Sequence, residues 1–193
     1  VVVNEQYPPN TTDFTGLVQK AKAANADMLL QLGLPNDSLQ VARTVQQLGY
    51  KPKLFCTCGS QVTTLPAWTK MGTAGEAVIG TTISWPTQNF QGLAELQTFF
   101  KGRGYDTIPA YGIVSYAILQ VLEQAVDGAK TLDDSKLKAY ILSHEFNTAA
   151  GNFKYQPDGT PVFSQVLLQY LNNKNEVIWP TQMKTASPVI PLP

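Results

Sequence analysis

An interrupted alternation of strands and helices is the feature of this sequence that most constrains its fold. Residues 1–84 read as three strand–helix units followed by a fourth strand, with strands expected at 1–4, 27–32, 53–57 and 77–84. The runs 27–32 and 77–83 are apolar in the manner of strands buried on both faces of a parallel sheet. We therefore predict an α/β fold in which these four strands form one open parallel sheet with helices on both faces.

The alternation stops at Trp85-Pro86-Thr87, because proline cannot donate to a central ladder. Helices are expected at 90–102, 109–127 and 133–143 with no strand between them, and strands follow at 152–155, 162–171 and 176–179. The middle helix carries a broad apolar face made of Tyr111, Val114, Ile118, Val121, Leu122 and Ala125. Such a face must pack on a sheet or on other helices, and no strand precedes it within reach. This pattern predicts a second lobe whose strands are mostly absent from the sequence, with a ligand cleft between the two lobes.

Composition excludes several classes of partner. Fourteen basic and 14 acidic residues give zero net charge, so we expect neither nucleic-acid binding nor attraction to an anionic membrane. No apolar run approaches 18 residues, so we expect no direct membrane insertion. Cys56, Cys58 and His144 are too few soft ligands for a tetrahedral zinc site, and we expect neither metal nor cofactor. The two cysteines are expected to point to opposite faces of a strand end, which favours two partly buried thiols over a disulfide.

Signatures of common enzymes are missing from the sequence. It contains no dinucleotide-binding glycine motif, no P-loop and no Gly-x-Ser-x-Gly. Gly102-Arg103-Gly104 ends a helix instead of opening one. His144 at a helix end suits the helix dipole. The sequence therefore predicts a protein that is not an enzyme.

Two loops at the carboxyl ends of the predicted strands are the candidate ligand site, because open parallel sheets bind ligands there, beside helix N-termini. The candidate ligand-binding residues are Gly33, Leu34, Pro35, Asn36, Asp37, Thr57, Cys58, Gly59, Ser60 and, at the crossing, Trp85. Helix capping alone would also explain Asn36, Asp37 and Ser60. Packing of the hinge would explain Trp85 equally well.

Several short motifs follow one another along the chain, namely Tyr7-Pro8, Thr12-Asp13-Phe14, residues 22–27, Ala42-Arg43, Leu48-Gly49, Tyr116-Ala117, residues 122–125, Gly151-Asn152-Phe153 and residues 156–159. In this order and spacing they resemble the branched-chain amino-acid-type solute-binding proteins of bacterial ABC importers. The resemblance implies a type I periplasmic-binding-protein fold of two lobes that close on a ligand, with the amino-terminal lobe largely missing. It assigns residues 1–85 to the carboxyl-terminal lobe and residues 86–161 to the amino-terminal lobe. Residues 162–193 would return to the carboxyl-terminal lobe and end in the tail. It also implies a periplasmic or extracytoplasmic location, a signal peptide in the precursor, and the membrane permease of an ABC importer as partner.

The sequence departs from that family at one informative place. Amino-acid binders of the family carry an acidic residue in the loop after the third strand, whereas this sequence has Thr57-Cys58-Gly59. A buried ammonium group needs a charged acceptor. Either Asp37 takes that role, or the ligand is an organic or aromatic acid or an amide, which we favour. A ligand-sensing receptor ectodomain of the same fold is the runner-up, and an α/β enzyme is the third alternative.

Overall fold

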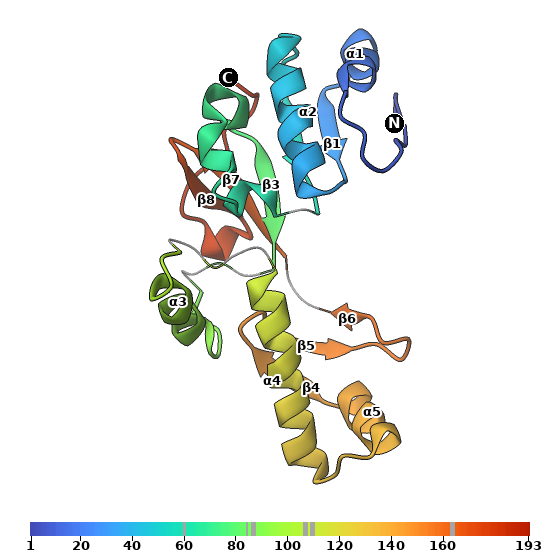
Figure 1. Cartoon of the computed structure of the whole chain (residues 1–193), viewed down its shortest axis with the longest axis vertical. Coiled ribbons are helices and arrows are strands. Elements are labelled where there is room, and N and C mark those ends of the chain that lie inside the picture. The colour runs from blue at the N-terminus through green and yellow to red at the C-terminus, as the bar shows by residue number, and fades with distance from the viewer. Residues whose placement is uncertain (60, 84, 86–87, 106–107, 109–110, 163–164) are drawn as a thin grey trace. The chain divides into compact units, whose positions relative to one another are not determined.

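The computed structural model of the chain describes residues 1–59, 61–83, 85, 88–105, 108, 111–162 and 165–193. The chain divides into two compact units (Figure 1). Unit 1 consists of Val1–Thr82 and Val166–Pro193, and unit 2 of Ile83–Gln165. Each unit has a hydrophobic core of its own.

A five-stranded sheet forms the centre of unit 1. Its strands, in spatial order, are β1 (Met28–Gln31), β2 (Leu54–Thr57), β3 (Ile79–Thr82), β7 (Val166–Leu171) and β8 (Lys174–Trp179). The first three are parallel, as their apolar runs predict, and the last two form an antiparallel hairpin that joins β3. Residues 1–4 are not a strand, which corrects the expected fourth member of the parallel set. A β-strand is defined by its backbone hydrogen bonds to a neighbouring strand, and none of the described residues pairs with residues 1–4 in this way.

Local signals set the bounds of the helices in unit 1. Asp13 Oδ1 accepts a hydrogen bond from Thr15 N at 2.9 Å where α1 (Thr15–Ala23) begins. Pro35 occupies the first turn of α2 (Pro35–Gln47), and Gly49 ends the helix with φ at 56°. The expected short helix around Trp68 is instead three 3₁₀ turns, which are η1 (Val62–Thr64), η2 (Trp68–Lys70) and η3 (Gly72–Gly75).

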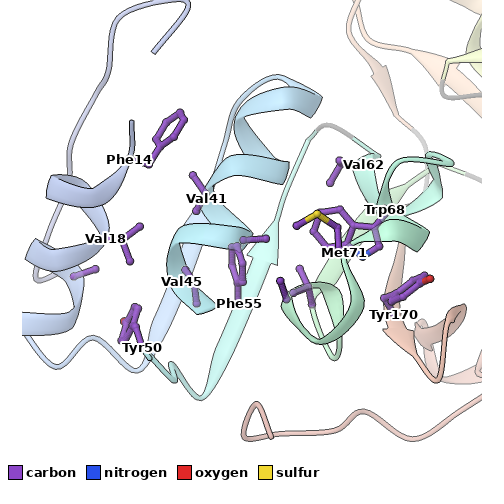
Figure 2. Packing of buried hydrophobic residues seen from close by; sticks show 14 residues of the cluster. Phe14, Val18, Val41, Val45, Tyr50, Phe55, Val62, Trp68, Met71 and Tyr170 are labelled. Carbon is purple, nitrogen blue, oxygen red and sulfur yellow. The ribbon is translucent and has the colours of Figure 1, made fainter. Parts of the chain in front are cut away.

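The two faces of this sheet are covered unequally. Figure 2 shows side chains of the cluster that covers one face, among them Phe14 and Val18 from the start of the chain, Val41 and Val45 of α2, and Phe55 of β2. The opposite face carries a small cluster of Cys56, Ile79 and Ile178. On that second face the β1 side chains Met28 and Leu30 are more than half exposed, at 55% and 59%.

The described residues of unit 2 form three helices followed by a small antiparallel sheet. The helices are α3 (Leu93–Lys101), α4 (Gly112–Ala129) and α5 (Asp134–Ser143), and the strands are β4 (Glu145–Thr148), β5 (Gly151–Tyr155) and β6 (Pro161–Val162). All three helices lie where the sequence predicts them. The expected long strand 162–171 is two strands, because β6 belongs to unit 2 and β7 to unit 1. Strand β4 is not predicted by the sequence. None of the helices that the structure describes is long and apolar enough to cross a membrane.

The apolar face predicted for α4 is partly covered, which corrects the expectation that nothing nearby could cover it. Val121 and Ala125 are buried against Phe146 and Phe153 of the hairpin that follows the helix in sequence. The other side of α4 stays open, since its apolar side chains are half exposed or nearly so: Tyr111, Ile118, Leu119 and Leu122. The helix is therefore apolar on more than one side, as a helix with neighbours on both sides would be.

Candidate functional site at the carboxyl edge of the sheet

The loops that follow β1 and β2 lie side by side. Gln31 and Thr57, the last residues of these parallel strands, are partners in the register, so both loops leave the sheet at one edge. A Cβ atom added to Gly59 would lie 3.9 Å from Leu32 Cδ2. The structure thus brings segment 33–37 next to Cys58 and Gly59, while Ser60 lies outside the described residues.

Asp37 belongs to a hydrogen-bond network at the start of α2. Its Oδ2 accepts a hydrogen bond from Leu34 N at 3.1 Å and another from the Tyr7 hydroxyl at 3.2 Å. Gln31 Nε2 donates to the Tyr7 oxygen at 3.1 Å, and Ser38 Oγ donates to Gln31 Oε1 at 2.6 Å. Asp37 therefore serves as a cap that ties the helix start to Tyr7.

Electrostatics at this network keep the tyrosine protonated. Burial raises the pKa of the Tyr7 hydroxyl, the hydrogen bond from Gln31 opposes that rise, and the nearby Asp37 carboxylate adds to it. The protonated Tyr7 hydroxyl lies within hydrogen-bond distance of two acceptors, the Asp37 carboxylate at 3.2 Å and the Leu32 carbonyl at 3.4 Å. Gly33 leaves no room for a side chain here, since an added Cβ would collide with the Tyr7 hydroxyl and the Gln31 amide.

Tyr7 and Gln31 are the members of this site that the sequence prediction missed. Tyr7 lies 30 positions before Asp37, so nothing local in the sequence connects the two. Gln31 offered one signal, because it is an amide within an otherwise apolar strand. Its side chain is 6% exposed, and a buried amide needs hydrogen-bond partners.

Apolar side chains dominate the exposed part of the edge. Leu32 and Leu34 are 73% and 69% exposed, and Asn36 is exposed beside them. Asp37 is the one charged side chain within the described parts of the loops 33–37 and 57–61. Among the described residues, no three histidine, cysteine or acidic side chains gather as a metal site would need.

Cys56 and Cys58 form a disulfide, which corrects the expectation of two thiols. The expected geometry was wrong because side chains alternate along a strand, so residues two apart share a face. Their Cα atoms are 5.4 Å apart, within the range of disulfides. Thr57 between them is buried and donates to the Ile79 carbonyl at 3.3 Å. Gly59 N donates to Thr81 Oγ1 at 3.1 Å, which ties this loop to β3.

Trp85 lies in unit 2 and is partly buried. Its backbone N–H donates to the Gln88 side chain, and its carbonyl accepts from Gln88 N at 2.9 Å. These contacts form a local turn. A position of Trp85 beside the two loops of unit 1 stays a prediction.

Curated relatives match this chain over almost its whole length. Leu/Ile/Val-binding protein homolog 7 of Brucella abortus (strain 2308) is 26% identical over 190 residues, which are 93% of this chain and 48% of that relative. Homolog 8 of the same strain is 24% identical over 162 residues, which are 78% of this chain and 40% of that relative. The chain thus spans about half the length of the curated relatives it matches.

Solved structures show the same fold. A leucine binding protein of Thermotoga maritima superposes with a TM-score of 0.75 at 20% identity, over 89% of this chain and 49% of the other. An ABC transporter solute binding protein of R. palustris in complex with 4-hydroxybenzoate also gives 0.75, at 17% identity, over 100% of this chain and 53% of the other. A second R. palustris solute binding protein, in complex with benzoate, gives 0.71 at 15% identity over 89% and 48%.

The periplasmic binding protein family matches residues 1–175, which is most of the chain. That match agrees with the three parallel strands, with helices packed against them, and with the folds of the solved structures. The chain belongs to the periplasmic binding protein family.

Proposed function

We propose that this chain is part of an extracytoplasmic solute-binding protein that delivers a small molecule to the permease of an ABC importer. The observation that carries the proposal is the carboxyl edge of the parallel sheet, where the loops after β1 and β2 meet. Ligands of open α/β sheets bind at such edges. Family membership supports the transport role, and we propose no enzymatic activity.

The ligand class follows from the charges at this edge. The Asp37 carboxylate already accepts hydrogen bonds from Leu34 and Tyr7. Recruiting it to a ligand ammonium would compete with a helix cap worth about 1 kcal/mol. The Cys56–Cys58 disulfide carries no charge. Apolar side chains dominate the remaining exposed surface, and Asn36 adds an uncharged amide. We therefore propose an organic or aromatic acid or an amide without an α-ammonium group.

Hinge closure is the proposed mechanism. We assign residues 1–85 and 162–193 to the carboxyl-terminal lobe and 86–161 to the amino-terminal lobe. A ligand that contacts both lobes only in the closed state shifts the population toward that state. Trp85 at the crossing would then supply an aromatic wall, worth about 0.5–1.5 kcal/mol beyond the area it buries.

Calorimetric titration of the two-lobed protein that carries residues 1–193 tests this proposal. Benzoate, 4-hydroxybenzoate, benzamide and leucine are the probes. We expect micromolar binding of at least one aromatic probe and none of leucine. Leu34→Ala should weaken that binding, because the Leu34 side chain is exposed at the proposed contact. Leu132→Ala is the matched control, since Leu132 is similarly exposed, at 78%, in the segment before α5.

Two results would contradict the proposal. Micromolar binding of leucine that Asp37→Asn abolishes would show that Asp37 supplies a charge to the ligand. Chemical conversion of a bound probe, followed by NMR over hours, would show an enzyme instead of a binding protein.

A further inference from the structure

The disulfide between Cys56 and Cys58 closes a very small ring of the chain. The two cysteines are two positions apart, with Thr57 alone between them, and they are the only cysteines of the 193 residues. A disulfide stabilises a fold mainly by constraining the unfolded chain, and this effect shrinks as the closed loop becomes shorter. A ring of this size constrains the unfolded chain little, so stability does not account for the bond.

Backbone pairing already fixes the position of this ring. Cys56 lies opposite Leu30 of β1 and Ile79 of β3 in the parallel ladders. Just beyond β2, Gly59 N donates to Thr81 Oγ1 at 3.1 Å. None of these contacts uses a sulfur atom, so they persist when the S–S bond is broken. The sheet can therefore hold a pair of thiols in place for the bond to form again.

The two sulfur atoms differ in their access to solvent. Cys56 is 4% exposed and is buried in the cluster with Ile79 and Ile178. Cys58 is only partly buried and lies in the turn that follows β2. The rate of thiol–disulfide exchange depends on which sulfur an attacking thiolate can reach. A thiolate from solution therefore reaches Cys58 Sγ, and Cys56 Sγ is the leaving group.

We propose that the Cys56–Cys58 bond is a thiol–disulfide exchange site, which a dithiol reductant opens by attack on Cys58 Sγ. The thiolate of the reductant forms a mixed disulfide with Cys58, and the S–S bond breaks with its electron pair on Cys56 Sγ. Cys56 takes up a proton. The second thiol of the reductant then attacks the reductant's own sulfur in the mixed disulfide and releases Cys58, which also takes up a proton. The protein gains an electron pair and two protons, and the reductant leaves with an internal disulfide.

This exchange gives the carboxyl edge of the sheet two chemical states. In the disulfide state the ring ties Cys58 to the buried Cys56. In the dithiol state Cys58 is released from the ring and offers an S–H group, which is a weak hydrogen-bond donor, beside the loop that follows β1. The inference does not depend on the ligand or on transport.

Reduction of the folded 193-residue chain by dithiothreitol tests the site. Samples taken over time are blocked with iodoacetamide, and mass spectrometry counts the alkylated cysteines. We expect the folded chain to be reduced at a rate within tenfold of the urea-unfolded chain, because the bond is reached without unfolding. Thioredoxin, a protein dithiol, is the second probe. A higher rate per thiol than that of dithiothreitol assigns the exchange to a protein reductant, and a lower rate assigns it to a small one.

A matched pair of variants tests the point of entry. Cys56→Ser leaves Cys58 as the single thiol of the chain, and Cys58→Ser leaves Cys56. We expect an aromatic disulfide reagent such as dithiobisnitrobenzoate to react at least tenfold faster with the first variant, because Cys56 is buried. If either variant does not fold, partial alkylation of the reduced parent chain, located by fragmentation of the peptide that carries both cysteines, gives the same ratio.

Amide hydrogen exchange distinguishes a local site from a brace of the sheet. After reduction we expect faster exchange at Cys58 and Gly59, because the ring that holds this turn is open. Exchange in β1, β2 and β3 should stay unchanged, because their ladders do not involve sulfur.

Three results would overturn the proposal. The first is reduction of the folded chain that is more than tenfold slower than reduction of the unfolded chain, which would mean that the bond is closed to solvent. The second is equal reactivity of the two single-thiol variants. The third is faster amide exchange throughout β1, β2 and β3 after reduction, which would make the bond a structural brace.

Discussion

Single residues decide the chemistry of the candidate site. Asp37 reads in the sequence as either a helix cap or a partner for a ligand ammonium group. Its hydrogen bonds to Leu34 and Tyr7 favour the first role. A carboxylate that accepts two donors at a helix start is already compensated, and moving it to a ligand would take this acceptor away from the Leu34 N–H.

Glu176 gives the clearest pH dependence. Its carboxylate accepts hydrogen bonds from Lys174, at 2.5 Å, and from Thr185, and these lower its pKa. A lowered pKa in the folded state stabilises the protein above the ordinary glutamate range. That stability is lost as the pH falls through about 4 toward the folded-state value. We expect Glu176→Gln to reduce the loss of unfolding free energy as the pH falls, measured by urea unfolding between pH 3 and pH 6.

Lys174→Met should reduce the same acid-induced loss of unfolding free energy in part, because it removes the larger of the two hydrogen bonds that lower the Glu176 pKa. If both variants lose as much unfolding free energy at acid pH as the parent chain, the assignment of this pKa shift to the contacts with Lys174 and Thr185 is contradicted.

At the scale of elements, α4 shows that hydrophobic periodicity detects a buried face without identifying its cover. The sequence correctly marks the helix as too apolar to stand alone. It assigns Val121 and Ala125 to a missing lobe, whereas the β4–β5 hairpin covers them. Ile118, Leu119 and Leu122 remain exposed, as the prediction of an apolar face left open by this chain requires.

Paired substitutions on α4 test this division of its faces. Val121→Ala should lower the free energy of unfolding by about 1–3 kcal/mol, because Val121 is 5% exposed and its truncation leaves a cavity. Ile118→Ala should change it by less than about 0.5 kcal/mol, because Ile118 is 58% exposed. Urea unfolding of the 193-residue chain measures both. An equal loss for the two variants would mean that the Ile118 face is covered in solution.

At the scale of the whole molecule, two cores that share no described residue support two units of separate stability. Phe146, 1% exposed in unit 2, and Phe55, 1% exposed in unit 1, are the matched probes. Phe146→Ala should make opening of unit 2 easier by about 3–5 kcal/mol and leave exchange in β1, β2 and β3 unchanged.

Phe55→Ala should produce the reverse pattern. Amide hydrogen exchange followed by mass spectrometry measures both variants. Equal acceleration across both units in either variant would contradict their independence.

Local patterns in the sequence determined the elements of this protein. Strands and helices are located through contacts between near neighbours, by the apolar runs, the Asp13 side chain that accepts from Thr15 N, the proline that starts α2 and the glycine that ends it. Parallel pairing of β1, β2 and β3 follows because strands that alternate with helices re-enter the sheet in the same direction. This also placed the loops 33–37 and 57–59 at one edge, which is the part of the candidate site that the sequence predicts.

Only the tertiary structure decided what those elements meet. The Tyr7–Asp37 contact spans 30 positions, and the β3–β7 ladder joins residues 79–82 to 166–169. The same holds for the hairpin against α4, the absence of a partner for residues 1–4 among the described residues, and the Cys56–Cys58 bond at the end of β2. Periodicity shows which side chains need burial or a partner. Which partner they find depends on where distant segments of the chain come together in space, because burial and hydrogen bonding are properties of neighbours in three dimensions.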